Sequence, residues 1–240
     1  MHTAHRDLLK QIVGKAGKPK PNPFLDNYLG NKHPKYAINS PTLRGIAREW
    51  VRSHKDVPPN ELADVLRSLV CGKSCTEKML AGLLLDSARK EQRAITPAWF
   101  DRYLNHLVGW VEVDTLCTGR YAEEEILNQW SAWRAQLNRF AKSDNIQKRR
   151  ASLVLLCSPL RKHGDPRLLK QAFLTIDKLG HEKDVLITKA VSWVLRSALT
   201  HFPGEVKKYV TLNADRLPKI AVRETMTKLP TGTKTKRKTQ

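Results

Sequence analysis

Helix-start signals recur from one end of the chain to the other, and they limit the fold more than any other feature of the sequence. Apolar residues follow them at the three- and four-residue spacing of an amphipathic helix, as in Leu43, Ile46 and Trp50. No alternating β-branched runs are joined by an Asn-Gly or Asp-Gly turn. The sequence therefore predicts an all-α fold. A proline at the first helical position marks Ser40-Pro41, Pro58-Pro59, Thr96-Pro97 and Asp165-Pro166.

The expected helices are similar in length and are joined by short turns rich in Pro, Gly, Asp and Ser. Pairs of such helices would repeat about every 35–45 residues, as HEAT-like repeats do. We expect an α-solenoid of HEAT-like helical repeats that forms a curved superhelix with a concave basic face; a compact irregular bundle is the alternative. The later helices are expected at residues 74–90, 123–142, 143–156, 165–179, 184–201, 205–213 and 217–228, with breaks at 202–204 and before Pro230.

Two segments differ from this helical body. Residues 17–23 are rich in Pro and Lys and cannot continue a helix, so they are interpreted as a linker after an N-terminal helix at residues 1–16. Residues 24–230 form the expected helical-repeat domain. Residues 231–240 are expected to be a flexible basic tail, which serves DNA affinity or localisation or is only a solvated end.

The charge balance points to a polyanionic partner. Lys and Arg number 43 against 23 Asp and Glu, a formal net charge of +20 at pH 7, which favours DNA, RNA or an anionic membrane surface. No run approaches the roughly 18 apolar residues of a spanning helix, and the charged start MHTAHRDLLKQ does not resemble a secretory signal. We expect a protein that is not secreted and does not bind membranes, and that is cytoplasmic and nucleoid-associated, or nuclear in a eukaryote.

The four cysteines, Cys71, Cys75, Cys117 and Cys157, fit thiols that stay reduced inside a cell. Cys71 and Cys75 have three residues between them and lack a second Cys/His pair at zinc-finger spacing. We therefore expect no metal and no cofactor.

The densest basic run begins at Ser143-Asp144, which is expected to cap a helix. Lys148, Arg149 and Arg150 follow in its first turns, where the helix amides and the macrodipole add to their attraction for a phosphate. A solvated face without a dedicated role is the alternative interpretation.

Two pairs of residues, each of a tryptophan and a charged residue, have the spacing of neighbours on one helix face. Trp110 and Asp114 are four residues apart: an indole can hold a cation, while a carboxylate stabilises positive charge developing at a sugar carbon or polarises a water. Trp193 and Arg196 are three apart, which suits a polyanion with exposed bases or sugars. Taken singly, each tryptophan could instead be a core residue and Asp114 a helix cap.

These blocks resemble, in order, motifs of the AlkD-like family of DNA alkylpurine glycosylases, which fold as α-solenoids of HEAT-like repeats. The resemblance runs through most of the chain, and its two middle blocks are the most specific. It rests on Tyr36-Ala37-Ile38-Asn39-Ser40-Pro41-Thr42-Leu43-Arg44, on Trp110-x-x-x-Asp114, on Ser143-Asp144-Asn145-Ile146 with Arg150, on Lys189-Ala190-x-x-Trp193-Val194-Leu195-Arg196, and on Leu217-Pro218 with Arg223-Glu224.

The resemblance implies a catalytic cleft formed by Trp110, Asp114 and Trp193, with Arg150 holding the DNA backbone near the lesion. We also expect DNA contacts from Lys148, Arg149, Arg196 and Arg223. One departure concerns the residue after Trp110: family members often have an acidic residue there, whereas this chain has Val111 and then Glu112.

The predicted function is a monomeric DNA repair enzyme of the glycosylase class. It would hydrolyse the N-glycosidic bond of cationic N3- or N7-alkylpurines in double-stranded DNA, without a deep base-flipping pocket. One alternative is a non-catalytic HEAT-like protein that recognises damaged or distorted DNA. The other is a helical-repeat scaffold that binds an acidic protein.

Overall fold

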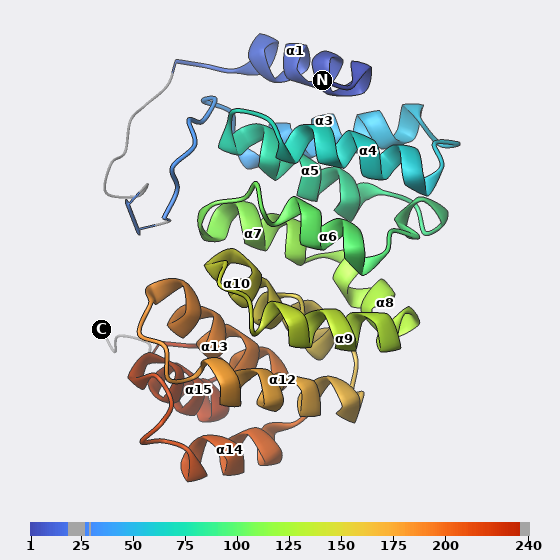
Figure 1. Ribbon diagram of the computed structural model, residues 1–240. Helices are drawn as coiled ribbons and strands as arrows, with labels where there is room; N and C mark the ends of the chain where they lie inside the picture. Colours follow the sequence, from blue (N-terminus) through green and yellow to red (C-terminus); the bar gives the residue numbers. More distant parts are fainter. Residues whose placement is uncertain (19–26, 29, 236–240) are drawn as a thin grey trace. The chain divides into compact units, whose positions relative to one another are not determined.

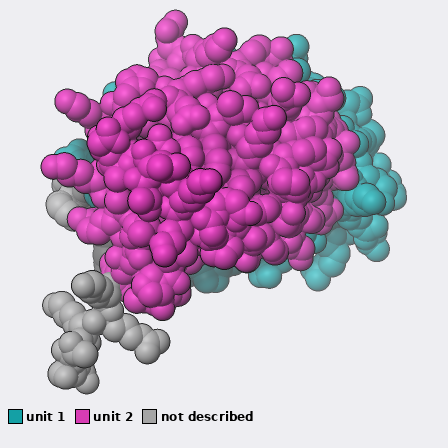
Figure 2. Space-filling model, turned by 90° about the horizontal axis from the view of Figure 1, so that it is seen from below, with its two compact units in different colours: residues 1–121 teal, residues 122–240 magenta. Residues whose placement is uncertain are grey.

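The computed structural model describes residues 1–18, 27–28 and 30–235. It is all-α, and within the described residues the one β-type pairing is an isolated antiparallel bridge between Gly17 and Ala37. The chain divides into two compact units, residues 1–121 and 122–240 (Figure 2). No helix in the described ranges is long and apolar enough to cross a membrane.

Unit 1 builds a helical repeat from two series of helices (Figure 1). One series runs from α3 to α5 to α7, each packed on the next, and α4 and α6 pack beside it, with α1 against α3 and α4. The bounds are α1 (Thr3–Lys15), α3 (Ser40–Ser53), α4 (Pro59–Val70), α5 (Cys75–Ser87), the 3-10 helix η1 (Glu91–Arg93), α6 (Pro97–Tyr103) and α7 (Gly109–Cys117).

Unit 2 repeats the scheme. Its series α10, α13 and α15 is packed in that order, and α9, α12 and α14 lie alongside, with α11 inserted between α10 and α12 in sequence (Figure 1). The bounds are α8 (Arg120–Asn128), which begins at the end of unit 1, α9 (Trp130–Phe140), α10 (Ile146–Val154), α11 (Cys157–Lys162), α12 (Pro166–Leu179), α13 (Val185–Ala198), α14 (Pro203–Leu212) and α15 (Lys219–Thr231).

The expected all-α helical-repeat class is therefore confirmed. The assignment of residues 1–16, 17–23, 24–230 and 231–240 to a helix, linker, domain and tail stays a prediction. Of the linker, residues 19–23 lie outside the described residues, as do residues 236–240 of the tail.

Some predicted helix limits were wrong. The helix expected at 123–142 is divided in two, because Gln129 has φ −112° and ψ 37° and caps α9 instead of continuing α8. Asn145, and neither Ser143 nor Asp144, caps α10, since its side chain accepts from the backbone N–H of Gln147 at 2.8 Å.

Two prolines also sit inside helices where breaks were expected. Pro203 is the first residue of α14, where the missing N–H costs no intrahelical hydrogen bond. Pro230 lies in the last turn of α15, which continues to Thr231. A proline signal alone therefore misplaces the limit by a few residues.

Candidate functional site

The first candidate surface is the outer face of α7 in unit 1, which carries Trp110 and Asp114 as predicted. Both side chains are partly exposed, whereas Val113 and Leu116, on the other face of the helix, are buried in the core. The four-residue spacing thus places an indole and a carboxylate together at the surface of the unit.

Glu112 fixes the start of α7. Its carboxylate is fully buried and accepts from the backbone N–H of Val108 at 2.7 Å, while His33 lies 2.8 Å away from its second oxygen. Burial, and next the Glu112 charge, raises the pKa of Cys75 to about 12, which keeps this thiol protonated and inert. The acidic residue that follows Trp110 by two positions is thus a structural anchor.

The distance between α7 and α5 depends on a close approach of their backbones. A Cβ on Gly82 of α5 would fall 2.3 Å from the carbonyl oxygen of Thr115, so that only glycine lets the backbones come this near. This contact sets how closely α7, with Trp110 and Asp114, packs on α5.

Asp114 lines a cavity of about 280 Å³ in unit 1. The hydroxyls of Thr115 and Thr118, which also line it, donate to the carbonyls of Val111 and Asp114 at 2.6 and 2.7 Å. Those hydroxyls therefore serve the helix backbone. Among the described residues, the charged side chains that line this cavity are those of Asp114, Asp86 and Arg44.

Asp86 ties the floor of this cavity to the turn after α7. Its carboxylate accepts from the backbone N–H of Arg120 at 2.9 Å and lies 3.8 Å from the guanidinium of Arg44. Gly119 has φ +90°, and a Cβ there would fall 2.2 Å from Asp86, so the turn requires glycine. The Arg44 side chain remains about half exposed at 55% and can reach an anion in solvent.

Tyr28 completes the aromatic part of this surface. Its ring meets Trp110 edge to face, with centroids 5.0 Å apart and planes at 79°. Such a pair presents aromatic faces that attract a cation. Tyr28 lies outside every motif that the sequence singled out, so its part in the surface depends on the fold.

The second candidate surface is one face of α13 in unit 2. Lys189, Trp193 and Arg196 are partly exposed at spacings of four and three residues, while Val191, Val194 and Leu195 are buried. The interpretation of Trp193 and Arg196 as surface neighbours therefore holds for the helix itself.

Arg196 is held from behind by two residues. Its Nε donates to Ser192 Oγ at 3.2 Å and lies 3.3 Å from Glu224 Oε2, and Ser192 in turn donates to the same oxygen at 2.6 Å. Glu224 comes from α15, packed against α13, and is 9% exposed. A buried carboxylate thus fixes one edge of the guanidinium.

Two more cations gather around Arg196. Lys228 donates to the Arg196 carbonyl at 2.9 Å, and Arg161 reaches Ser197 Oγ at 3.4 Å. Burial lowers the pKa of Lys228, and the charges of Arg196 and Arg161 lower it further. We call Arg161, Arg196 and Lys228 the α13 cluster; the sequence singled out only Arg196.

The run at the start of α10 is used differently. Arg149 binds both oxygens of Glu182 at 2.8 and 3.2 Å and also donates to the carbonyls of Ser143 and Asp144 at 2.8 and 2.9 Å. Every guanidinium nitrogen of Arg149 therefore has a protein acceptor. We call Lys148, Arg149 and Arg150 the α10 cluster.

Arg150 is 1% exposed and donates to the carbonyl of Leu186 in the first turn of α13. Lys148 is partly exposed, and Arg223 on α15 is exposed. The DNA contacts of Lys148, Arg149, Arg150, Arg196 and Arg223, and the catalytic roles of Trp110, Asp114 and Trp193, stay predictions. The structure groups Trp110 with Asp114 in unit 1, and Trp193 with Arg196 in unit 2.

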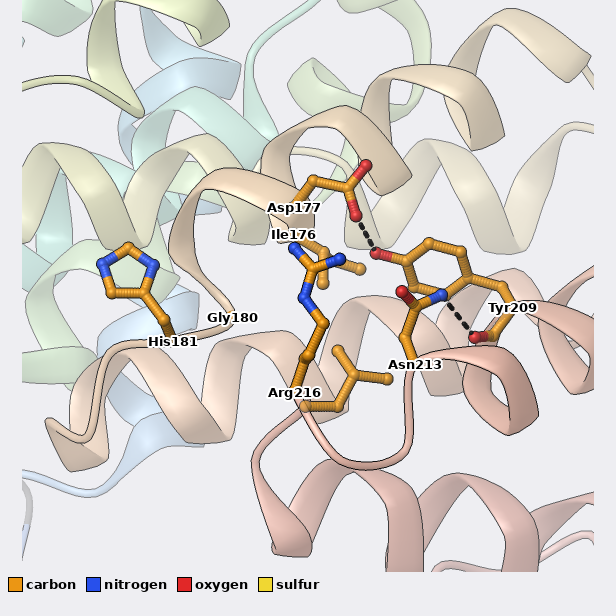
Figure 3. A pocket seen from close by; sticks show the side chains of 8 residues that line it. Ile176, Asp177, Gly180, His181, Tyr209, Asn213 and Arg216 are labelled. Atoms are coloured by element: carbon orange, nitrogen blue, oxygen red, sulfur yellow. Dashed lines mark hydrogen bonds between the residues drawn. The ribbon is translucent and has the colours of Figure 1, made fainter.

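Two other cavities contain none of the predicted site residues. One, of about 170 Å³ in unit 2, is lined by Tyr209, whose hydroxyl donates to Asp177 at 2.6 Å, and by His181 and Arg216 (Figure 3). Tyr209 also stacks on Phe173 with ring centroids 3.9 Å apart. These contacts join α12 to α14, so the polar residues that line this cavity are explained by the packing of the two helices.

The other cavity, of about 810 Å³ in unit 1, lies beside α1. Here the buried His5 bridges Ser68 Oγ at 2.9 Å and Glu77 Oε1 at 2.8 Å. Burial would raise the pKa of Glu77, but the hydrogen bonds from His5 and Ser74 outweigh it and hold the pKa below its usual value. This network attaches α1 to α4 and α5. No group of three or more His, Cys, Asp or Glu side chains in the described ranges could hold a metal ion.

The fold and the two surfaces define a class, the all-α helical-repeat proteins with an aromatic and acidic helix face and separate basic clusters. Residues 9–229 match the family of DNA alkylation repair enzymes, and the chain belongs to that family. Among solved structures it is similar in fold to a predicted DNA alkylation repair enzyme from Enterococcus faecalis, with TM-score 0.65 and 18% identity over 87% of this chain and 96% of that one. Comparison with curated proteins gives no match.

Family membership supports a role in the repair of alkylated DNA, with DNA as the partner, and it confirms the resemblance found in the motifs.

Proposed function

We propose that the chain is a DNA glycosylase that hydrolyses the N-glycosidic bond of cationic N3- or N7-alkylpurines in duplex DNA, acting as a monomer in the nucleoid or the nucleus. The observation that carries the proposal is the α7 face, where Trp110 and Asp114 stand together and Asp114 lines a cavity. The reaction is the one that the motif resemblance to AlkD-like glycosylases implies, and the family match supports a role in the repair of alkylated DNA.

The chemistry of the lesion suits a site with one carboxylate. An alkylated purine of this kind already carries positive charge, so its bond to deoxyribose is weakened and the base leaves without protonation by a general acid. Positive charge then grows on the sugar. A carboxylate such as Asp114 stabilises that charge and orients the attacking water.

Aromatic side chains suit the same lesion. The faces of Trp110 and Tyr28 attract a cation, and their edge-to-face contact of 5.0 Å holds them in one arrangement. We propose that they contact the cationic nucleotide, and we propose Trp193 as an aromatic DNA contact of unit 2. The cavity beside Asp114 holds about 280 Å³ between helices and side chains, which suits a surface site without a deep base pocket.

Backbone binding would come from the arginines and lysines. Arg44, half exposed beside Asp114, is our addition to the proposed contacts Lys148, Arg196 and Arg223. Its ion pair with Asp86 is long at 3.8 Å and exposed, so it competes weakly with a phosphate. Arg149 and Arg150, which the sequence also suggested as DNA contacts, are proposed instead to hold the start of α10 in place, because Glu182 and backbone carbonyls accept from their guanidinium groups.

The decisive test is base release from methylated duplex DNA. Asp114→Asn keeps the shape of the side chain and removes its charge, so we expect single-turnover release to slow by about 100-fold or more. Asp7→Asn removes the same charge from the exposed surface of α1 and should leave the rate unchanged. Release at the wild-type rate by Asp114→Asn would refute the proposed role.

Two further outcomes separate the alternatives. If the wild-type protein binds damaged duplex but releases no base, the non-catalytic DNA-binding function replaces the glycosylase. If duplex DNA binds no better than other polyanions of equal charge, the result favours the alternative function, a scaffold that binds an acidic protein.

A further inference from the structure

We propose that Glu224 and Ser192 are positioning residues that hold Arg196 ready to bind a DNA phosphate. The inference rests on the DNA-binding part of the proposed function and adds a role for two residues that do not themselves touch DNA. One carboxylate inside a basic region would thereby strengthen, and not weaken, the binding of a polyanion.

The hydrogen bonds of Arg196 use only one edge of its guanidinium. Ser192 and Glu224 both engage Nε, at 3.2 and 3.3 Å. Neither terminal amino group has an acceptor among residues 1–18, 27–28 and 30–235. Those two amino groups are the pair that binds a phosphate with two parallel hydrogen bonds.

Glu224 has little freedom to move away. It is 9% exposed, and its Oε2 accepts from the fully buried Ser192 at 2.6 Å. Because Glu224 belongs to α15 and Ser192 to α13, the packing of the two helices sets the geometry. An arginine fixed in this way loses less rotational freedom when it binds, and that lowers the entropic cost of binding.

The surroundings favour an anion at the free edge. Lys228 donates to the Arg196 carbonyl at 2.9 Å and Arg161 reaches Ser197 Oγ, next to Arg196, at 3.4 Å; burial, and then the charges of Arg196 and Arg161, lowers the pKa of Lys228. A phosphate placed against the α13 cluster would relieve the mutual repulsion of three cations, while Glu224 balances only part of it in the free protein.

Glu224→Gln separates positioning from simple electrostatics. Removal of a negative charge should by itself tighten DNA binding. If Glu224 positions Arg196, the substitution instead weakens binding to an unmodified duplex by about 3–10-fold. Glu205→Gln removes an equal charge from the exposed first turn of α14, and we expect binding to be unchanged or slightly tighter.

A double-mutant cycle shows whether the effect passes through Arg196. Arg196→Ala should weaken binding about 10-fold and reduce the salt slope by about one unit. Adding Glu224→Gln to Arg196→Ala should cause no further loss. Ser192→Ala, which leaves the Glu224 ion pair intact, should cost about 2–3-fold and serves if Glu224→Gln unfolds; thermal unfolding of each variant shows that it is folded.

The outcomes are distinct. The inference is overturned if folded Glu224→Gln binds duplex as tightly as Glu205→Gln, if its effect adds fully to that of Arg196→Ala, or if Arg196→Ala binds like the wild type. It is also overturned if the wild-type protein does not bind duplex. A protein that binds with the expected cycle but releases no alkylated base would refute the glycosylase activity and leave this inference standing.

Discussion

The α10 cluster and the α13 cluster bring three cations each to unit 2, and they use them in opposite ways. In the α10 cluster, Arg149 gives all its nitrogens to Glu182 and to two carbonyls, and Arg150 is buried. In the α13 cluster, Arg196 is held at Nε alone. The difference teaches that the acceptors around an arginine, and not the density of basic residues, indicate which cluster is available to a phosphate.

The strongest way to break this comparison is Arg149→Ala. We expect it to lower the free energy of unfolding by about 2–3 kcal/mol, because Glu182 and two carbonyls lose charged hydrogen bonds. The salt slope of DNA binding should not change. Urea unfolding and binding at several salt concentrations measure the two quantities. Arg223→Ala, at an exposed position, is the control for stability alone, with a change of the free energy of unfolding below about 0.5 kcal/mol. A changed salt slope in Arg149→Ala would contradict the division between the clusters.

The caps of α10 and α13 give a matched pair of smaller effects. Asn145 and Asp184 each accept from a backbone N–H at 2.8 Å, so Asn145→Ala and Asp184→Ala should each cost about 1 kcal/mol of stability. Asp184→Ala also removes a negative charge from the start of α13, which should slightly tighten DNA binding. Thermal unfolding and duplex titration check both variants. If only Asn145→Ala changed the affinity for DNA, the result would contradict the assignment of phosphate binding to the α13 cluster.

Arg161→Ala tests whether the α13 cluster acts as a whole. We expect DNA affinity to fall about 3–5-fold and the salt slope to drop by about one unit. The side chain is exposed and binds only two serine hydroxyls, so stability should hardly change. Lys162→Ala, the exposed neighbour, is the control in the same titration. Equal losses for both variants would mean that general charge, and not this cluster, decides binding.

The smallest effect concerns pH. Burial, with the charges of Arg196 and Arg161, holds the pKa of Lys228 below its usual range. A bound phosphate would raise that pKa. DNA binding is therefore accompanied by uptake of a proton when the pH is above the lowered pKa of Lys228 in the free protein. Affinity should therefore fall by about 2–3-fold more in the wild type than in Lys228→Arg as pH rises from about 7 to about 9.5, below the ordinary lysine pKa. Anisotropy titrations across that range give the answer. Parallel pH profiles for the two proteins would remove Lys228 from the contact.

Local signals in the sequence were enough for the fold class and for most helix starts. The helices α12 and α13 begin where Asp165-Pro166 and Asp184 predict, because capping residues and proline act within one helical turn. The break at Gln129 was missed because no Gly or Pro marks it and the neighbouring residues have ordinary helical spacing.

The candidate site could be predicted only in part, for the same physical reason. The pair Trp110 and Asp114 shares a face by helical spacing alone. Glu182 lies 33 residues from Arg149, and Glu224 lies 32 residues from its partner Ser192. Such pairs depend on helix packing, so the sequence could not distinguish an arginine engaged by the protein from one with a free edge.

The contact between Gly82 and the Thr115 carbonyl has a consequence for the position of Asp114. With 2.3 Å between that carbonyl and an added Cβ, α7 has no clearance toward α5. A side chain at position 82 would push the helix that bears Asp114 away from α5, so the place of the carboxylate depends on a residue that does not line its cavity.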